Sequence, residues 1–242
     1  KQNKNKKIDI IEIHNRPEYV KYVKTYFPTT KIILFYHNDP VTLRGSENLT
    51  EREYLINACS KIIFVSRWIQ NKFFTQFMNS NYLDTEVIYP GVKIPKITKL
   101  KKNKNILFVG KLNESKGYNI FVEAAKKFKT YDKNWNFIAI GDEPRKKIFP
   151  DKKIINEIGY KSNKEILDYY LQSEISVGNS VWDEPFGRLP MESSSRKCLP
   201  IVSSKAGLNE SKKIAYVLKK NTPEYLFKIL KELTQNKILR KK

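Results

Sequence analysis

Short apolar runs alternate with amphipathic segments along the first part of the chain. The runs at residues 8–14 (IDIIEIH), 31–37 (KIILFYH) and 61–66 (KIIFVS) are rich in β-branched residues, which predicts strands. Between them, residues 18–27 and 50–60 repeat their apolar positions at helical spacing, which predicts helices. Because continuous apolar strands that alternate with helices are typical of a parallel sheet covered on both faces, the pattern predicts an α/β fold.

The pattern is interrupted once and then restarts. The segment YPGVKIP (residues 89–95) contains two prolines and a glycine, and a lysine-rich run follows it. Beyond it, strands are expected at 105–110, 135–141, 155–159, 174–179 and 200–204, and helices at 116–129, 163–171, 223–235 and, briefly, after Gly187. We therefore expect an incomplete N-terminal Rossmann-like domain (1–92), a linker (93–104) and a doubly wound C-terminal Rossmann-like domain (105–242).

The charge of the chain is strongly positive, with 46 Lys and Arg against 25 Asp and Glu and a formal net charge of +21. Such a charge favours contact with anionic membrane lipid, nucleic acid or an anionic substrate, or it keeps the surface solvated. The excess is spread over the whole chain, which favours the last interpretation. No module of interleaved basic and aromatic residues is present, so no specific nucleic-acid partner is expected.

Cysteine and histidine are scarce, with two of each, far from the spacing of a disulfide framework or a metal site. No apolar run approaches the roughly 18 residues of a membrane span, and the first residues lack a signal-peptide pattern. We therefore expect a cytoplasmic protein without a bound metal.

Polar residues follow the predicted strands at their carboxyl ends, where ligands of such sheets bind. His14 and His37 end two strands of the first domain, and Gly110 and Lys111 end the first strand of the second. Two domains with polar functional edges suggest a cleft between them.

The loop FVGKLNESKG (residues 108–117) leads into a predicted helix and carries Lys111 and Lys116. A helix N-terminus with two added cations suits a diphosphate; the alternative is two more lysines of a lysine-rich surface. The spacing matches neither a P-loop nor the GxGxxG of a nicotinamide site, so no such cofactor is expected.

The stretch DEPFGRLPMESS (residues 183–194) places Glu184 in a loop and Glu192 about one turn into a short helix. Carboxylates at these places can accept hydrogen bonds from the vicinal hydroxyls of a sugar and a ribose. The alternative is complementation of the helix dipole, which contributes about 0.3–1 kcal/mol. Phe186 is either a core residue or a platform for a sugar.

The segment EPFGRLPME resembles the Glu-x7-Glu signature of family 4 glycosyltransferases, which are retaining enzymes of the GT-B fold. FVGKLNESKGYNIFVEAAKKF is similar to the phosphate loop of that family, and EIHNRPEYV and ILFYHNDP resemble its two histidine-bearing strand ends. The resemblance covers almost the whole chain in the family's order. It implies two Rossmann-like domains that face a cleft.

The resemblance also implies a role for individual residues. Glu192 would hold the ribose of a nucleotide-sugar donor, and Glu184 would contact the transferred sugar. Gly110, Lys111 and Lys116 would bind the diphosphate. The other implied contacts are the backbone N–H groups of Phe186, Gly187 and Arg188, a base border at Gly159 and Tyr160, His14 near the anomeric carbon, and His37 on the acceptor side.

The implied reaction is metal-independent transfer of the sugar to a hydroxyl of a glycan or lipid-linked acceptor, as in polysaccharide or lipopolysaccharide biosynthesis. No cofactor beyond the donor is implied, and the basic surface suits peripheral contact with the inner face of the cell membrane. Lys111 departs from the family's usual Arg, and the family's crossing C-terminal helix is not found before Lys242. The alternatives are a non-catalytic nucleotide-sugar- or polyanion-binding protein and a GT-B epimerase.

Overall fold

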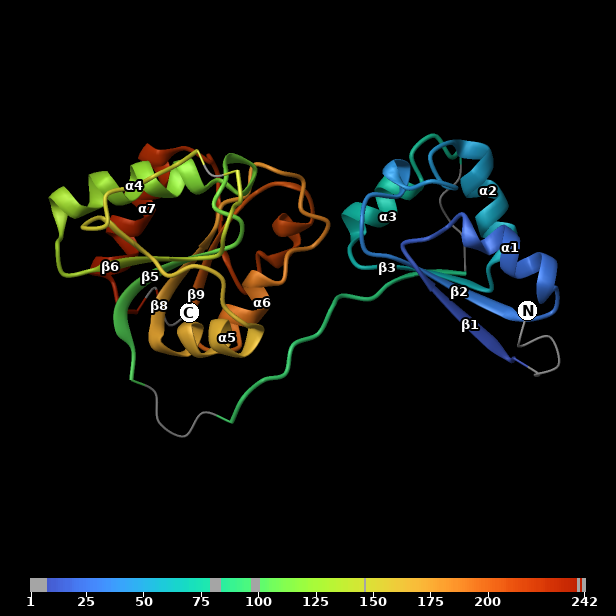
Figure 1. The fold of residues 1–242 in the computed structure, drawn as a ribbon, viewed down its shortest axis with the longest axis horizontal. Helices are drawn as coiled ribbons and strands as arrows, with labels where there is room; N and C mark the ends of the chain where they lie inside the picture. Colours follow the sequence, from blue (N-terminus) through green and yellow to red (C-terminus); the bar gives the residue numbers. More distant parts are fainter. Residues whose placement is uncertain (1–7, 79–83, 97–100, 146, 239, 241–242) are drawn as a thin grey trace. The chain divides into compact units, whose positions relative to one another are not determined.

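The computed structural model describes residues 8–78, 84–96, 101–145, 147–238 and 240. The chain divides into two compact units, Lys1–Pro90 and Gly91–Lys242 (Figure 1). Of the linker predicted at 93–104, residues 97–100 lie outside the described residues, and its last two residues already belong to a strand.

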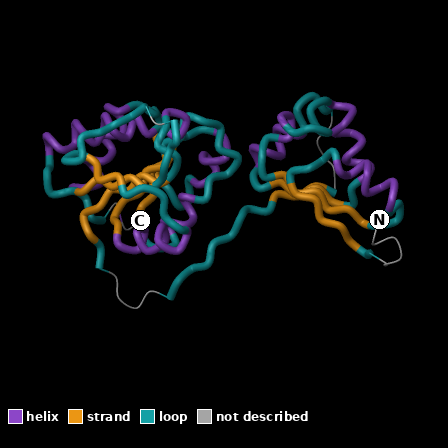
Figure 2. Tube along the Cα trace, in the orientation of Figure 1, coloured by secondary structure: helices purple, strands orange, loops and turns teal. Residues whose placement is uncertain are grey.

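The N-terminal unit is a parallel sheet with its helices on one face. Its described strands pair in the order β1-β2-β3-β4. Because crossovers between parallel strands are right-handed, a sheet that grows in one direction receives its helices on one side, as Figure 2 shows. Its elements are β1 (Ile10–His14), α1 (Tyr19–Tyr26), β2 (Lys31–Tyr36), η1 (Pro40–Thr42), α2 (Leu49–Ala58), β3 (Lys61–Phe64), α3 (Arg67–Phe73) and β4 (Thr85–Val87).

The C-terminal unit is a doubly wound parallel sheet with the strand order β10-β9-β8-β5-β6-β7. Helices α4 and α7 pack together on one face, and α5 and α6 cover the other (Figure 1). Its elements are β5 (Asn103–Val109), η2 (Glu114–Lys116), α4 (Tyr118–Tyr131), β6 (Asn136–Ile140), β7 (Ile155–Glu157), α5 (Asn163–Gln172), β8 (Ser173–Gly178), α6 (Leu189–Ser194), β9 (Leu199–Ser203), η3 (Ala206–Ser211), β10 (Tyr216–Leu218) and α7 (Pro223–Gln235).

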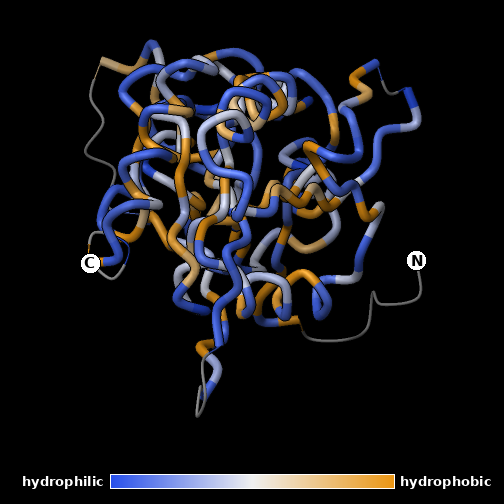
Figure 3. Tube along the Cα trace, turned by 90° about the vertical axis from the view of Figure 1, so that its left-hand side faces the viewer, coloured by the Kyte–Doolittle hydropathy of each residue, from blue (hydrophilic) through white to orange (hydrophobic). Residues whose placement is uncertain are grey.

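The core of the C-terminal unit lies along its central strands. Ile106, Leu107 and Phe108 of β5 and Ile175 and Val177 of β8 are at most 1% exposed. Full burial of such side chains contributes roughly 1.5–3 kcal/mol each, so this pair of strands is strongly held in the sheet. In Figure 3 hydrophobic stretches run through the interior of the trace, while the outer bends are mostly hydrophilic.

The predicted α/β fold with parallel sheets is confirmed, but cover on both faces is found in the C-terminal unit only. The described N-terminal strands follow one another in a single direction, so their helices lie on one face. The last helix has the predicted bounds, whereas α4 begins at Tyr118 rather than Lys116, because η2 occupies residues 114–116. Strand β10 was not predicted from the sequence; its three residues are too few to show a period. None of the helices in the described residues combines the length and apolar character needed to cross a membrane.

Lys102 holds three segments of the C-terminal unit together. Its Nζ donates to the carbonyl oxygens of Tyr170 (3.0 Å), Ser173 (2.7 Å) and Arg196 (2.9 Å). Tyr170 lies in the last turn of α5 and Arg196 follows α6, so the ammonium group also faces the carboxyl ends of two helices. Burial lowers the pKa of Lys102, and the three carbonyl oxygens take the place of water around the charge.

We expect Lys102→Met to lower the free energy of unfolding by about 2–3 kcal/mol, because three carbonyl oxygens lose a charged donor while the aliphatic stem remains. Lys101→Met, a change of the exposed neighbour, is the matched control. Chemical denaturation measures the free energy of unfolding of both variants. Equal stability of the two would show that the three hydrogen bonds of Lys102 contribute nothing.

Candidate donor site at the topological switch point

The two loops that carry the predicted donor residues leave neighbouring strands. β5 and β8 pair directly, but the chain runs from β5 toward β6 and from β8 toward β9, in opposite directions along the sheet. The loops after these strands therefore diverge, and the space at the carboxyl ends between them is where doubly wound sheets bind ligands. Residues 110–117 and 179–188 form these two loops.

The loop after β5 is shaped by two residues. The Asn113 side chain accepts from the backbone N–H of Lys116 (3.2 Å) and so caps η2. Gly117 has φ +76°, and a Cβ there would lie 2.1 Å from the carbonyl oxygen of Asn179, so only glycine allows the two loops to come this close. Gly110 follows β5, and its N–H bonds the Ile140 carbonyl at 3.0 Å.

Lys116 and Glu184 form an ion pair between the two loops. Lys116 Nζ contacts Glu184 Oε1, with 30% and 18% of the respective side chains exposed. The Ser180 hydroxyl lies 3.2 Å from the same carboxylate oxygen. At this partly buried position a lysine can bind a diphosphate, and a carboxylate can accept a hydrogen bond from a sugar hydroxyl.

The turn between Glu184 and α6 depends on Gly187. Its φ is +79°, and a Cβ there would lie 2.5 Å from Leu208 Cδ2. The Gly207 N–H donates to the Glu184 carbonyl at 2.9 Å and anchors the start of the turn. Phe186, half-buried, lies within it.

Glu192 is buried in the first turn of α6, with 8% of the residue exposed. Its Oε1 binds Arg188 at 2.7 Å and Asn163 Nδ2 at 3.4 Å. A charge complementing the helix dipole could stay in water, whereas this carboxylate is held inside by two donors. Asn163 begins α5, directly after the loop of Gly159 and Tyr160, where Tyr160 is 75% exposed. The predicted base border therefore adjoins the surroundings of Glu192.

Lys111 is exposed and has an acidic neighbour that the sequence did not reveal. Glu143 accepts from Asn113 Nδ2 (2.6 Å) and from the Arg145 N–H (3.3 Å). These two bonds, with a weaker contribution from the charge of Lys111, lower the pKa of Glu143. The loop after β5 is thus held to the segment after β6 through Asn113.

The two histidines meet at the carboxyl edge of the N-terminal sheet. His14 Nδ1 and His37 Nε2 are 2.9 Å apart, and the His14 ring stacks on Phe35 at 4.4 Å. Asn15 accepts from the His37 N–H at 2.8 Å and orders the second strand end. Burial, and secondarily the neighbouring His14, lowers the pKa of His37.

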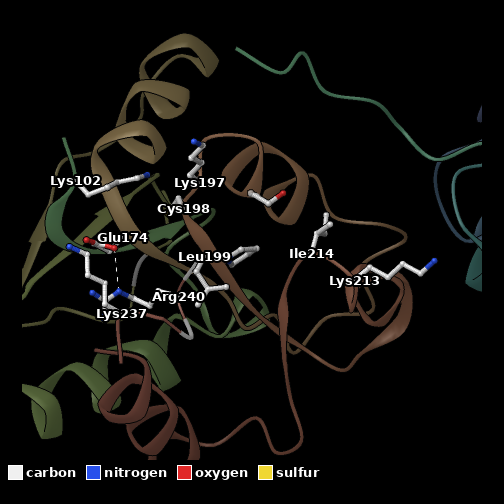
Figure 4. Close-up of a pocket in the computed structure, with 11 residues that line it drawn as sticks. Lys102, Glu174, Lys197, Cys198, Leu199, Lys213, Ile214, Lys237 and Arg240 are labelled. Carbon is white, nitrogen blue, oxygen red and sulfur yellow. Dashed lines mark hydrogen bonds and ion pairs between the residues drawn. The ribbon is translucent and has the colours of Figure 1, made fainter. Parts of the chain in front are cut away.

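A cavity of about 780 Å³ lies at the other edge of the C-terminal sheet. Figure 4 shows Glu174 at the start of β8 and Cys198 and Leu199 at the start of β9 around it, with Glu174 bonded to Arg240. None of the predicted site residues is among the described residues that line it. Two of its half-buried cations, Lys102 and Arg240, already bind protein oxygens, so this cavity is not the candidate donor site.

No group of three or more His, Cys, Asp or Glu side chains in the described residues has the arrangement of a metal site.

Sequence reasoning overlooked several polar residues that shape this site: Asn113, Glu143, Asn163, Asn179 and Ser180. Asn179 and Ser180 follow a strand at its carboxyl end, which is the signal that had singled out His14 and Lys111. Their contacts to the other loop arise only in the fold.

Comparisons with known proteins agree with this geometry. Residues 92–242, more than half of the chain, match the family model of glycosyl transferases group 1. The chain is 25% identical to the spore coat protein SA of Bacillus subtilis (strain 168) over 241 residues, which covers 85% of this chain and 62% of that protein. A second Bacillus subtilis relative is 23% identical and is covered over 57% of its length, so the chain spans about three fifths of these relatives.

Solved structures share the fold at low identity. Anabaena HepE in complex with UDP-glucose matches with a TM-score of 0.68 and 15% identity, covering 96% of this chain and 70% of HepE. A glycosyltransferase from Rickettsia africae matches with a TM-score of 0.73 and 20% identity over 96% of this chain and 69% of its own. With these neighbours the fold is of the GT-B type. The family match, which includes both loops at the switch point, shows that this chain belongs to the group 1 glycosyl transferases.

Proposed function

We propose that the protein transfers a sugar from a nucleotide-diphosphate sugar to a hydroxyl of a glycan or lipid-linked acceptor, with retention of the anomeric configuration, as a family 4 enzyme. The observation that carries this proposal is the ion pair of Lys116 and Glu184 between the two loops of the switch point. Glu192, buried in the short helix α6 that follows, would supply a second carboxylate for the sugar nucleotide.

The donor would be divided between named residues. Glu192 would bind the ribose hydroxyls, and Glu184 the transferred hexose. The diphosphate would lie against Lys111, Lys116 and the loop at Gly110. The other contacts we assign are the backbone of Phe186, Gly187 and Arg188 to sugar and phosphate, and Gly159 and Tyr160 to the base. The complex of HepE with UDP-glucose supports UDP-glucose as the first donor to test.

The reaction would break the bond between the anomeric carbon and the diphosphate oxygen and form one from that carbon to the acceptor oxygen on the same face. Negative charge grows on the diphosphate, and fixed cations stabilise it most when water is excluded. Lys111 and Lys116 would supply that stabilisation without a metal. The departing phosphate oxygen would take the acceptor's proton, which leaves His14 to orient the sugar and His37 to shape the acceptor side.

The proposal extends to the acceptor and the location, which the basic surface supports. A chain with a net charge of +21 is attracted to anionic lipid, so a lipid-linked acceptor at the inner face of the cell membrane is our proposal for the substrate. This would place the enzyme in the cytoplasm, in the synthesis of a polysaccharide or lipopolysaccharide.

Two variants test the donor site. Loss of a hydrogen-bonded carboxylate costs about 1.5–3 kcal/mol, or about 10–100-fold in affinity. We expect Glu192→Ala to weaken both UDP and UDP-glucose to that extent, and Glu184→Ala to weaken UDP-glucose while UDP still binds. Thermal-shift titration and calorimetry measure the affinity of each variant for both ligands.

Glu232→Ala, which removes an exposed carboxylate of α7, is the matched control. Parent-like binding of UDP-glucose by both site variants would refute the donor site. Binding without transfer or hydrolysis of the donor would favour a non-catalytic nucleotide-sugar-binding protein.

The histidine pair gives a prediction about pH. Because the pKa of His37 is lowered in the folded state, that state binds fewer protons than the unfolded chain near the ordinary value of about 6.5. The contribution of His37 to stability therefore rises with pH through this range and falls on acidification below about 6.5.

An NMR titration should place the midpoint of His37 below its ordinary value. In His14→Gln the midpoint should move part of the way back, because burial is the larger cause. An ordinary midpoint in the parent protein would contradict the partial desolvation of His37 and its pairing with His14.

A further inference from the structure

Further hydrogen bonds tie the two candidate donor loops together beyond the Lys116–Glu184 pair. The carbonyl oxygen of Ser115 accepts from the N–H groups of Val181 (2.9 Å) and Trp182 (2.8 Å). The Ser180 hydroxyl lies 3.1 Å from the same oxygen. The backbone next to Lys116 is thereby fixed against the segment that leads to Glu184.

A second connection lies one step deeper. Asn179 is fully buried, and its Nδ2 donates to the Gly117 carbonyl at 3.0 Å. Asn221 Nδ2 donates to the Asn179 carbonyl at 2.8 Å, and the Ser203 hydroxyl donates to the Ser180 carbonyl at 2.8 Å. The backbone at Asn179 and Ser180 is thus held from two sides. The Cα of Ser180, from which its side chain extends, is therefore fixed in position.

The contacts of the Glu184 carboxylate are one-sided. Both of its side-chain partners in the described part of the chain, Lys116 Nζ and Ser180 Oγ, lie at Oε1. Oε2 has no hydrogen-bond partner among the described residues, so it can accept from a ligand hydroxyl without displacing a protein group.

The Ser180 hydroxyl has one proton and three acceptors within reach. They are the Ser115 carbonyl at 3.1 Å, the Glu184 carboxylate at 3.2 Å and the Trp182 carbonyl at 3.3 Å. The two carbonyl oxygens remain acceptors in every state of the site, and the Ser115 carbonyl already has two backbone donors. The proton can therefore turn to the carboxylate when that oxygen loses another donor, at little cost.

We propose that Ser180 is a positioning residue that holds Glu184 Oε1 when the donor draws Lys116 to its diphosphate. This proposal rests on the proposed function, in which Lys116 binds phosphate and Glu184 binds the sugar. Ser180 then keeps Oε2 directed at the sugar hydroxyl, and without it the carboxylate rotates freely once Lys116 has left. Ser180 acts on the sugar through Glu184 and touches neither the nucleoside nor the diphosphate.

The test compares UDP-glucose with UDP on Ser180→Ala. Loss of one hydrogen bond to a carboxylate should lower affinity for UDP-glucose and kcat for its transfer or hydrolysis by about 10-fold. Affinity for UDP should stay within about two-fold of the parent, because UDP has no sugar for Glu184 to bind. Retained UDP binding also shows that the variant is folded.

Ser203→Ala is the matched control. Ser203 is 2% exposed and its hydroxyl donates to the Ser180 carbonyl, so its loss loosens the same loop without touching the carboxylate. We expect a lower thermal midpoint in Ser203→Ala and a parent-like ratio of UDP-glucose to UDP affinity. A ratio that changes equally in both serine variants would mean general loosening and would overturn the positioning role.

Glu184→Ala separates the two proposals. If it loses UDP-glucose preference and Ser180→Ala does not, the positioning role is wrong and the donor site stands. If Glu184→Ala itself keeps the parent's ratio, the sugar-binding role of Glu184 fails, and the role of Ser180 fails with it.

Discussion

The direct pairing of β5 with β8 is the constraint on which the rest of the C-terminal unit depends. These parallel strands pair directly, yet the chain leaves them in opposite directions. The loops after them must therefore separate at the sheet edge and be rejoined by side chains. Their divergence sets the place of the proposed donor site, and their rejoining by polar groups gives that place a fixed shape.

Close backbone approach makes the rejoining possible. Gly117 brings one loop against Asn179 of the other, and Gly187 turns the second loop under Leu208. With those distances set, Lys116 and Glu184 meet, and Ser180 reaches both loops. The positions of the charged groups thus depend on two glycines that have no functional side chain.

Much of the fold was predictable, because apolar runs and helical spacing are local properties. The helix over Pro223–Gln235 has its Thr222 cap and first-turn proline in the sequence itself, and it was predicted with its observed bounds. The start of α4 was placed two residues early because Asn113 caps a separate 3-10 turn, η2, over residues 114–116. Gly117, in the left-handed region, ends that turn before α4 begins, a boundary that periodicity does not resolve. β10 exists because β9 offers it a partner.

By itself the sequence determined the α/β class, the two parallel-sheet units and the residue types of the proposed sugar-nucleotide site, since pattern and motif are written along the chain. It could not determine which side chains meet across long separations. The pairing of Lys116 with Glu184, the burial of Glu192 beside Asn163 and the reach of Ser180 to both loops were decided only by the tertiary structure. These contacts join residues brought together by strand order, which is a property of the whole sheet rather than of any segment.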